Sequence, residues 1–570
     1  MMRKTILTFS TALLCVMLIN TVNTNACTNF LATKGATVDG STILTYTADA
    51  GGFMEPLYFH AGGKQDTTVM LEIREWDSGK LLGKIKQVPE TYRVVGNMNE
   101  HQLTVGETTF GGREELKDTN AIMDYGSLIY ISLQRAKTAR EAIKIITDLV
   151  AEYGYYSGGE SFSLVDPNEV WIMEMISKGT HEKGAVWVAR RIPDGYIAAH
   201  ANKARITNII ENDPDNCLYS PDVIDFAIRM GYYNPASGKP FSFEAAYDPA
   251  TPSSLFACEG RVWSLYRRSA PSLNLSPDYF RAVIGAEPYP LYIKPDKKLS
   301  LQDVFSLMRD HFQGTEFDMT KGIAAGPYGN PYRWKPLRFK IEGDTTLYAW
   351  ERPISTQQTA WSFVAQMRSH LPREIGGVLW YGVDDTYSTV YVPLYCCITT
   401  PPPAFMNADV ARFDLNSMSW MFNLVANKAY SMYSYIIKDI QKEQARIESG
   451  FLLHQEMMEN AFLGLLKDNR IRENIKDWKH PEIKDNRDLV ISGLTNYSND
   501  AAARTLQDWR KLWEYLVMKY NDLYINDVHK DIGRSPFGQG YGDDFFKQVI
   551  RERPGYYEMK WKQPVKSKKR

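Results

Sequence analysis

The sequence predicts an α+β fold with antiparallel sheets and a helical C-terminal region. Strand-like segments come first, two helical segments follow, and more strands come after them, with no repeating βαβ period. Asp-Gly and Pro-Asp-Gly signals between short apolar runs are typical of antiparallel hairpins. Beyond residue 404 the chain turns helical and charged. This order favours α+β packing over a doubly wound parallel sheet.

The start of the chain has the pattern of a secretory signal peptide. Arg3 and Lys4 are positive, residues 6–19 are mostly apolar, and residues 24–26 (Thr-Asn-Ala) form a cleavage site of the A-x-A kind. The apolar run is shorter than the roughly 20 residues of a membrane span, so an uncleaved anchor is the less favoured alternative. We therefore expect cleavage of residues 1–26 and export to the periplasm or the extracellular space, with Cys27 as the first mature residue.

A bacterial lipoprotein also begins at a cysteine, and acylation of Cys27 is a competing interpretation. That processing prefers a large aliphatic residue three positions earlier, where this chain has Thr24. Acylation would block both the thiol and the α-amine. The protein would then be a non-catalytic lipoprotein that binds peptides or glycans at a membrane surface. No later segment of the sequence is long and apolar enough to span a membrane.

The composition narrows the class of partner. Lys and Arg number 66 against 67 Asp and Glu, which leaves no basic surplus for nucleic acid. Of the six cysteines, Cys15 belongs to the predicted leader, and Cys217 and Cys258 are a candidate disulfide in an exported protein. Adjacent Cys396 and Cys397 are expected to be buried. The sequence has neither a CxxC pair nor an HExxH helix, so we expect no metal and no cofactor.

Two hairpins organise the predicted strands. Residues 28–32 and 41–44 flank an Asp-Gly turn, which puts Cys27 at the start of the first strand. Residues 185–190 and 196–201 flank a Pro-Asp-Gly turn and predict another hairpin. Further strands are expected at 94–106, with a turn near Glu100 and His101, and at 161–165, 170–175, 350–352, 362–366, 378–381 and 389–394.

Two helices are predicted between the early strands. The first covers residues 125–137, and the second begins at Thr138. Thr138 and Glu141 form the pattern of a capping box, in which each side chain satisfies the other residue's backbone amide. Gly154 is expected to end the second helix.

A proline run marks the predicted domain boundary. Residues 399–403 read Thr-Thr-Pro-Pro-Pro, and proline cannot sit in a central strand. We therefore divide the mature chain into a catalytic domain, 27–404, and a helical region, 405–570. The sequence leaves open whether the helical region forms a homo-oligomer. Its helices are expected at 417–448, 452–467 and 500–524.

An N-terminal Cys27 would carry a nucleophile and a base on one residue. An α-amine has a pKa of about 7.7–8.0, so part of it is neutral near pH 7 and can accept a proton. The thiol is a strong nucleophile once deprotonated. Its attack on an amide carbonyl forms an oxyanion, which needs aimed donors worth roughly 3–4 kcal/mol each. Water then hydrolyses the thioester, and no separate histidine is required.

Several ordered motifs give the sequence a family resemblance. They are Cys27-Thr28, Ala36-Thr37, Asp39-Gly40-Ser41 and Asp49, then GNMNEHQLTVGETTFGG at 96–112, TAREA at 138–142, AAHANKARI at 198–206 and WYGVDDTYSTVYVPLY at 380–395. Together they resemble the PepD-type cysteine dipeptidases, a family of N-terminal nucleophile (Ntn) hydrolases. The resemblance implies an αββα sandwich with Cys27 at the end of a central strand. It also implies hydrolysis of dipeptides or other short peptides without a cofactor.

The resemblance also implies roles for residues near Cys27. Asp49 matches the acid that hydrogen-bonds the amine of the nucleophile, with a surface loop as the alternative. Asn202 matches an asparagine that orients the amine or binds the oxyanion. Related bile-salt and penicillin amidases have an arginine three residues before the acid. This chain has Tyr46 there, which we expect to contact the substrate.

Oxyanion and arginine positions are less closely matched. Residues 107–109 occupy the region where the amidases place an oxyanion asparagine, so a backbone amide or the Thr109 hydroxyl is expected to contact the substrate instead. The arginine near the nucleophile is Arg261, or else Arg267 or Arg268. A solvated arginine is the alternative for Arg261.

Two acidic residues complete the predicted site. Asp384 and Asp385 either line the substrate pocket or cap a turn, whereas Glu100 and His101 are expected to be structural. The favoured function is that of an exported cysteine dipeptidase. The enzymatic alternative is an amidase of N-acyl amino acids, such as bile-salt or penicillin-like amides.

Overall fold

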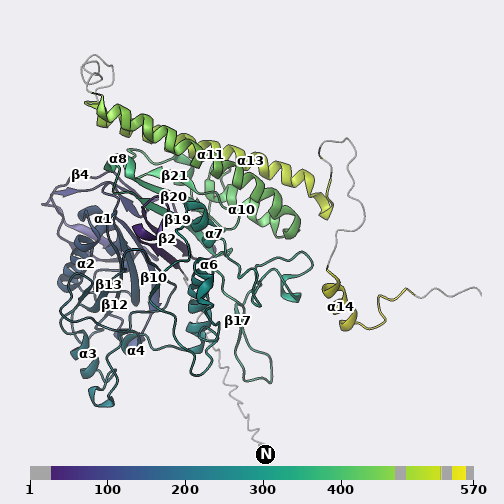
Figure 1. Cartoon of the computed structure of the whole chain (residues 1–570), viewed down its shortest axis with the longest axis horizontal. Coiled ribbons are helices and arrows are strands. Elements are labelled where there is room, and N and C mark those ends of the chain that lie inside the picture. The colour runs from purple at the N-terminus through teal and green to yellow at the C-terminus, as the bar shows by residue number, and fades with distance from the viewer. Residues whose placement is uncertain (1–26, 469–482, 527, 529–541, 560–570) are drawn as a thin grey trace, which may run out of the picture.

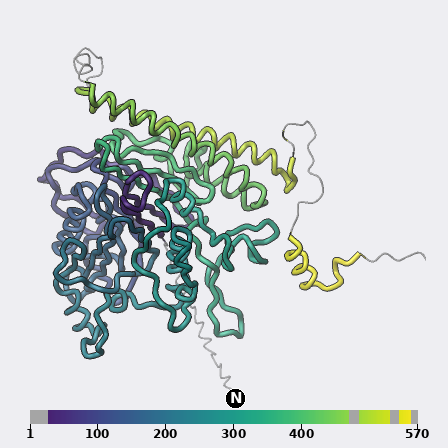
Figure 2. Tube along the Cα trace, in the orientation of Figure 1, coloured from purple at the N-terminus to yellow at the C-terminus, as the bar shows by residue number. Residues whose placement is uncertain are grey.

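Two antiparallel sheets lie face to face at the centre of the computed structural model, and helices cover their outer sides (Figure 1). The structure describes residues 27–468, 483–526, 528 and 542–559, so the predicted leader lies outside the described residues. The expected α+β class, with its αββα layers and helical C-terminal region, is confirmed. Figure 2 shows the purple start of the described chain in the interior. There β1 and β2 lie between β14 and β19, two strands from much later in the sequence.

The first sheet has seven strands, in the order β16-β14-β1-β2-β19-β20-β21. The predicted hairpin is confirmed, because β1 pairs with β2 so that Thr28 faces Thr47. Gly40, in the Asp-Gly turn, has a φ of +71°, which favours glycine. The bounds are β1 (Thr28–Ala32), β2 (Thr42–Asp49), β14 (Ile197–His200), β16 (Tyr292–Ile293), β19 (Thr359–Met367), β20 (Gly377–Val383) and β21 (Val392–Tyr395).

The second sheet has eight strands, in the order β15-β13-β12-β11-β10-β9-β8-β3. The predicted turn near His101 is confirmed, and the His101 ring packs edge-on against Tyr92. The bounds are β3 (Phe59–His60), β8 (Val94–Val95), β9 (Met98–Asn99), β10 (Thr104–Gly111), β11 (Gly159–Val165), β12 (Val170–Ser177), β13 (Ala185–Arg191) and β15 (Cys217–Tyr219).

Three two-stranded ribbons lie outside the main sheets. The strand predicted at 350–352 is wrong in position, since the extended pair ends at β18. The segment predicted at 389–394 becomes a strand only from Val392, because the preceding residues form the turn after β20. The ribbons are β4 (Gly63–Lys64) with β7 (Glu90–Thr91), β5 (Leu71–Arg74) with β6 (Leu81–Ile85), and β17 (Arg338–Phe339) with β18 (Tyr348–Ala349).

The hairpin predicted between 185–190 and 196–201 is wrong. Strand β13 pairs with β12 and β15 in the eight-stranded sheet, whereas β14 pairs with β1 and β16 in the other sheet. The Pro-Asp-Gly connection therefore carries the chain from one sheet to the other. Its Asp194 carboxylate accepts a hydrogen bond from Gly35 N at 2.7 Å, which docks the connection beside the end of β1.

Helices α1 (Tyr125–Arg135) and α2 (Ala139–Tyr153) cover the eight-stranded sheet. The cap at Thr138 is confirmed, because its hydroxyl accepts a hydrogen bond from Glu141 N at 3.2 Å. Only half of the capping box forms, since the Glu141 carboxylate accepts from Lys137 N at 2.7 Å rather than from Thr138 N. Gly154 ends α2 with a φ of +78°.

The C-terminal helices α10, α11 and α13 lie against β20 and β21 of the seven-stranded sheet. Helices α10 and α11 occupy the two segments predicted at 417–448 and 452–467, but the break between them lies earlier than predicted, at 430–432. Helix α13 begins well before residue 500 because Asp485 caps it, accepting from the amides of Arg487 and Asp488. The division of the chain at residue 404 stays a prediction. The bounds are α10 (Met418–Ala429), α11 (Tyr433–Lys467), α13 (Asn486–Lys519) and α14 (Asp543–Glu552).

The remaining α-helices are short and lie in the middle of the chain. Helix α6 contacts β14, and Phe305 of α7 packs its ring against Trp380 of β20. These two helices therefore share the outer face of the seven-stranded sheet with the C-terminal helices. The bounds are α3 (Val223–Arg229), α4 (Phe243–Tyr247), α5 (Pro252–Ser254), α6 (Gly260–Ser269), α7 (Leu301–Met308), α8 (Arg373–Gly376) and α9 (Pro403–Met406).

A buried ion pair fastens α11 to the sheet. Both terminal nitrogens of Arg368 donate to the Glu459 carboxylate at 2.7 Å, and Tyr395 donates to the same group at 2.6 Å. The Arg368 and Glu459 side chains are each only 7% exposed. Removing one partner of a buried pair leaves an uncompensated charge, which is far more costly than losing an exposed pair.

The substitution Glu459→Ala is therefore expected to lower the free energy of unfolding by roughly 3–5 kcal/mol. The matched control is Asp148→Ala, which removes an exposed helical pair with Lys144 and is expected to leave the melting midpoint almost unchanged. Scanning calorimetry of both variants measures the difference. Equal midpoints for the two variants would show that the Arg368–Glu459 pair does not hold α11 on the sheet.

Candidate active site

Cys27 lies directly before β1. Its sulfur is buried beside the side chains of Tyr46 and Glu107 and the backbone of Asp49. The thiol donates to Glu107 Oε1 at 3.4 Å and lies 3.5 Å from the Tyr46 hydroxyl oxygen. Tyr46 in turn donates to the same Glu107 oxygen at 2.5 Å. The predicted nucleophile and the predicted contact residue Tyr46 are thus brought together around a carboxylate.

The surroundings of Cys27 keep its thiol protonated. Burial raises the pKa of the Cys27 thiol well above its ordinary value, and the negative charges of Glu107 and Asp49 raise that pKa further. Hydrogen bonds from Tyr46 and from the Asp49 backbone lower the pKa by less. A thiol in this state becomes a nucleophile only when a nearby base accepts its proton during attack.

Arg261, on α6, holds the backbone of Cys27 in place. Its Nη1 donates to the carbonyl of Cys27 at 2.6 Å and to Thr28 Oγ1 at 2.9 Å. Its Nη2 donates to the Asn202 side chain at 3.0 Å and to the Ala201 carbonyl at 3.2 Å. One fully buried guanidinium therefore joins the first strand to the segment that follows β14.

The other two candidate arginines point elsewhere. Arg267 and Arg268 each contact the Asp310 carboxylate, at 3.4 and 3.3 Å. Burial and the nearby charge of Arg352 lower the pKa of Arg261 to about 10, so the guanidinium of Arg261 stays charged near neutral pH.

Asn202 connects Arg261 to β10. Besides accepting from Arg261, its side chain donates to the carbonyl of Thr109 at 2.7 Å. Asn202 has a φ of +59°, a left-handed conformation that asparagine tolerates better than most residues. The Thr109 hydroxyl donates to Glu160 Oε2 at 2.9 Å, and that of Thr108 bonds His200, so both hydroxyls are engaged.

Asp49 ends β2 and is fully held by neighbouring groups. Arg352 donates to its Oδ2 at 2.6 Å, and Thr359 donates to its Oδ1 at 2.7 Å. Thr47, which also accepts from the Thr28 amide, lies 3.3 Å from Oδ2. The side chain is buried, so the alternative of a surface loop is wrong. The predicted hydrogen bond from Asp49 to the free amine of Cys27 stays a prediction.

Glu107 and Glu160 form a buried carboxyl pair beside the thiol. Apart from each other, Glu107 Oε2 and Glu160 Oε1 meet no hydrogen-bond donor in the described part of the protein. Burial raises the pKa of both carboxyl groups, and the charge of Glu107 raises the pKa of Glu160 further, well above its ordinary value. We therefore assign the shared proton to Glu160 and the negative charge to Glu107, which accepts from Tyr46, Cys27 and Glu160.

Asn29 fixes Glu107 from the opposite sheet. Its amide nitrogen donates to the Glu107 carbonyl at 3.0 Å, and its oxygen accepts from Glu107 N at 3.2 Å and from Ser163 Oγ at 2.9 Å. This approach requires glycine at position 106, because a Cβ there would lie 2.9 Å from the Asn29 side chain. The backbone that carries Glu107 is thus clamped to the strand that follows Cys27.

Asp384 and Asp385 lie in the turn that follows β20. Asp385 accepts from the Ser355 hydroxyl at 2.6 Å and from Tyr387 N at 3.1 Å, and Asp384 accepts from the Asp385 amide at 2.7 Å. Burial raises their pKa values to about 6 for Asp384 and about 7 for Asp385. These bonds are those of the turn-capping alternative, and contact with substrate stays a prediction.

An aromatic recess adjoins the thiol. The Tyr46 ring lies 4.9 Å from that of Trp361, which lines the recess together with Glu55. Burial raises the pKa of Glu55 to about 7. The other lining residues are Pro56, Tyr58, Trp76, Gly96, Asn97, Tyr130 and Tyr381.

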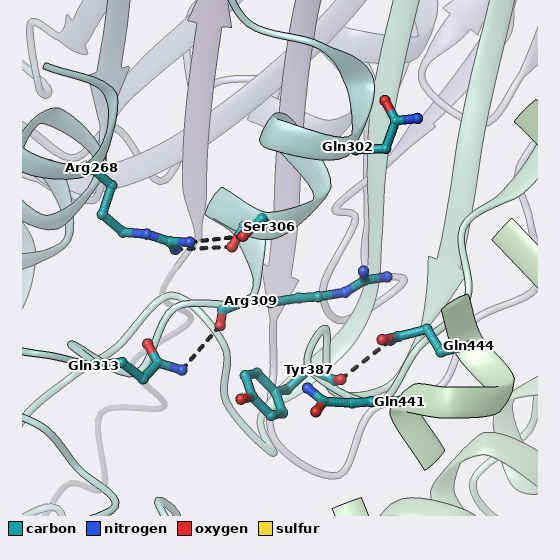
Figure 3. A pocket seen from close by; sticks show the side chains of 8 residues that line it. All are labelled: Arg268, Gln302, Ser306, Arg309, Gln313, Tyr387, Gln441 and Gln444. Carbon is teal, nitrogen blue, oxygen red and sulfur yellow. Dashed lines mark hydrogen bonds between the residues drawn. The ribbon is translucent and has the colours of Figure 1, made fainter. Parts of the chain in front are cut away.

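A second cavity, of about 390 Å³, lies near α7 and α11 and contains none of the residues around Cys27 (Figure 3). Arg268 donates there to Ser306, and Arg309 is paired with Glu448. Both cations of the cavity are therefore already neutralised or hydrogen-bonded within the protein. The remaining lining residues are Gln302, Gln313, Tyr387, Gln441 and Gln444.

The predicted disulfide between Cys217 and Cys258 is wrong, since both are free thiols. Cys217 lies on β15 and accepts from Ile210 N at 3.4 Å, whereas Cys258 donates to the Asn202 carbonyl at 3.2 Å. Cys396 and Cys397 are buried, as expected. Within the described ranges, no group of three or more His, Cys, Asp or Glu residues could hold a metal ion, and no described helix could span a membrane.

The sequence alone does not predict roles for Glu160 and Arg352. It predicts Glu107 only as part of the oxyanion region. A glutamate inside an apolar strand pattern was the available signal, because an ionisable side chain is rarely buried without a purpose. No local pattern marks Arg352, whose partner Asp49 lies far away in the sequence.

The chain is similar to a family of peptidases and to proteins named dipeptidases. The model of peptidase family C69 matches residues 68–446. A "Probable dipeptidase" of Latilactobacillus sakei is 26% identical over 408 residues, which cover 68% of this chain and 76% of the relative. A "Probable dipeptidase" of Salmonella dublin is 26% identical over 389 residues, or 65% and 81% of the two chains. "Dipeptidase A" of Lactobacillus helveticus is 24% identical over 429 residues, or 71% and 82%.

The contact between Cys27 and Glu107 predicts the reactivity of the thiol. Glu107→Gln removes a negative charge beside the sulfur, so the pKa of Cys27 falls and its alkylation by iodoacetamide at pH 8 accelerates by about tenfold. Mass spectrometry of the peptide that carries Cys27 measures the rate. The control is Glu174→Gln, a buried carboxyl of β12 that binds the Ile206 amide instead. An unchanged or slower rate in Glu107→Gln would contradict this electrostatic account.

Proposed function

The chain belongs to peptidase family C69, and from that premise we propose that it is an exported dipeptidase whose nucleophile is Cys27. As a member of the family it is a peptidase. The names of its relatives support dipeptides as substrates. The matched segment begins after Cys27, so the role of Cys27 is supported by the buried thiol in contact with Tyr46 and Glu107. Export is supported by the leader pattern of residues 1–26.

Removal of the leader would leave Cys27 with a free α-amine beside its own thiol. In the proposed first step the amine accepts the thiol proton while the sulfur attacks the carbonyl carbon of the peptide bond. The C–N bond then breaks, and the ammonium returns its proton to the leaving amino acid. In the second step the amine takes a proton from water, and the hydroxide hydrolyses the thioester. The C–S bond breaks, the first amino acid leaves with the new carboxyl group, and the ammonium returns its proton to the sulfur, which restores the thiol.

The groups around Cys27 suit these steps. Arg261 fixes the carbonyl of the first residue, so the amine and the sulfur are held in one orientation. A nearby cation disfavours protonation of an amine, which keeps part of the amine available as a base. The Tyr46 hydroxyl lies 3.5 Å from the sulfur, and in the proposed reaction its hydrogen turns from Glu107 to the developing oxyanion.

The carboxyl pair favours dipeptides over N-acyl amino acids as substrates. Glu107 carries a buried charge within reach of any group attached to the attacked carbonyl. A dipeptide brings an ammonium group to that position, whereas an N-acyl substrate brings only an apolar chain. Burial of a charge next to an apolar group is unfavourable.

Substitution of Cys27 tests the proposed nucleophile. We expect Cys27→Ala to lower kcat for dipeptide hydrolysis by at least roughly a thousandfold, and Cys27→Ser to lower it sharply because a hydroxyl is a weaker nucleophile. Release of free amino acids measures the rate. The control is Cys217→Ala, a buried free cysteine on β15, which should retain activity. Full activity in Cys27→Ala would end the proposal.

A substrate panel separates the two enzymatic functions. Purified mature protein is offered unblocked dipeptides and, in parallel, N-acyl amino acids such as a bile-salt amide and a penicillin. We expect hydrolysis of the dipeptides. Hydrolysis of the N-acyl compounds alone would replace the dipeptidase with an amidase.

A further inference from the structure

We propose that Glu107, backed by Glu160, binds the free α-ammonium group of the substrate and thereby restricts the enzyme to peptides with an unblocked N-terminus. This inference rests on the proposed function, since it assigns a recognition role beside the same nucleophile. The ligand is a primary ammonium group on the carbon next to the attacked carbonyl.

The Glu107–Glu160 pair carries a buried negative charge. Glu107 and Glu160 are 2% and 0% exposed, and neither forms an ion pair with any residue that the structure describes. A buried carboxylate without a cation is costly, and sharing one proton removes only one of the two charges. The remaining charge, placed 3.4 Å from the nucleophile, calls for a cation that arrives with the substrate.

The distance from Glu107 Oε1 to the Cys27 sulfur matches the spacing of the groups in a dipeptide. In a dipeptide the ammonium nitrogen and the carbonyl carbon are bonded to the same Cα, so they lie about 2.5 Å apart. A carbonyl carbon about 3–3.5 Å from the sulfur is ready for attack. Because Glu107 Oε1 lies 3.4 Å from that sulfur, an ammonium about 2.8 Å from Oε1 fits the same arrangement. Glu107 therefore recognises the residue whose carbonyl is attacked.

Negative charge extends outward from the Glu107–Glu160 pair to Asp77. Asp77 is exposed, accepts from the Tyr125 hydroxyl at 2.8 Å, and lies close enough for its charge to raise the pKa of Glu107, Glu160 and Glu55. An acidic approach of this kind attracts cations and repels anions. It favours entry of a peptide with its ammonium end first.

The amine of mature Cys27 is the competing occupant. If Glu107 held that amine, it would stabilise the protonated form and remove the base from the reaction. Loss of Glu107 would then change the rate for every substrate to the same extent. Loss of an ammonium site, in contrast, lowers the rate for substrates that carry an ammonium group relative to those that lack one.

The experiment compares an unblocked dipeptide, Ala-Ala, with N-acetyl-Ala-Ala in mature wild-type, Glu107→Gln and the control Glu174→Gln. We expect wild-type to prefer the unblocked peptide by about 100-fold or more in kcat/KM. In Glu107→Gln that preference should collapse, mainly through a higher KM for Ala-Ala. Any change in thiol reactivity acts on both peptides and therefore cancels in the ratio of their kcat/KM values. Glu174→Gln should keep the wild-type ratio. An unchanged ratio in Glu107→Gln, or an equal loss for both peptides, would overturn the inference.

A binding measurement keeps this test apart from the test of the nucleophile. Calorimetric titration of Cys27→Ala with Ala-Ala should show binding that N-acetyl-Ala-Ala lacks, and the double variant Cys27→Ala/Glu107→Gln should lose it. Equal binding of Ala-Ala by the single and double variants would overturn the inference even if Cys27 is the nucleophile. Loss of binding in the double variant would support it even if Cys27→Ala keeps its activity.

Discussion

The hydrogen bond from the Cys27 thiol to the Glu107 carboxylate is the contact on which the rest of the site depends. It joins the start of β1, in one sheet, to β10, in the other. The contact requires the sheets to approach closely, which glycine at position 106 permits and the Asn29 amide enforces. Arg261 then fixes the backbone of Cys27 from the helical layer. Cys27 is therefore positioned by three layers of the fold rather than by a loop.

A buried polar layer between the sheets supports this contact. His200 accepts or donates at both ring nitrogens, to Thr108 and Ser163, at 2.7 Å each. Burial lowers the pKa of His200 to about 3, so the ring stays neutral and bridges the two hydroxyls at any physiological pH. Ser163 also donates to Asn29. Because each member of this layer is hydrogen-bonded, the layer specifies one register between the sheets.

Local signals carried the successful predictions. The Asp-Gly hairpin at Cys27, the Thr138 cap and the end of α2 at Gly154 were predicted because each depends on a few neighbouring residues. The false hairpin between β13 and β14 had equally good local signals. A turn sequence does not determine which sheet the next strand will join. Here β14 pairs with β1 instead of β13.

The same difference between local and long-range contacts separates the site residues that could be predicted from those that could not. Cys27 could be found from the predicted leader and Tyr46 from the family resemblance, and the Tyr46 hydroxyl lies beside the Cys27 thiol. Arg261 could only be chosen from three alternatives, since its contacts join residues more than 200 positions apart. The Glu107–Glu160 pair depends on the pairing of β10 with β11, which brings two separate strands into register. Such long-range pairing leaves only a buried glutamate as its trace in the sequence.

The proposed reaction requires a mature N-terminus at Cys27 with a free amine and a free thiol. Intact-mass measurement and N-terminal sequencing of active, natively exported protein should find Cys27 as the first residue, with an unmodified amine and thiol. Fully active protein that retained residues ahead of Cys27, or that carried a lipid on Cys27, would contradict the claim that the sulfur and the nitrogen of one residue perform the reaction.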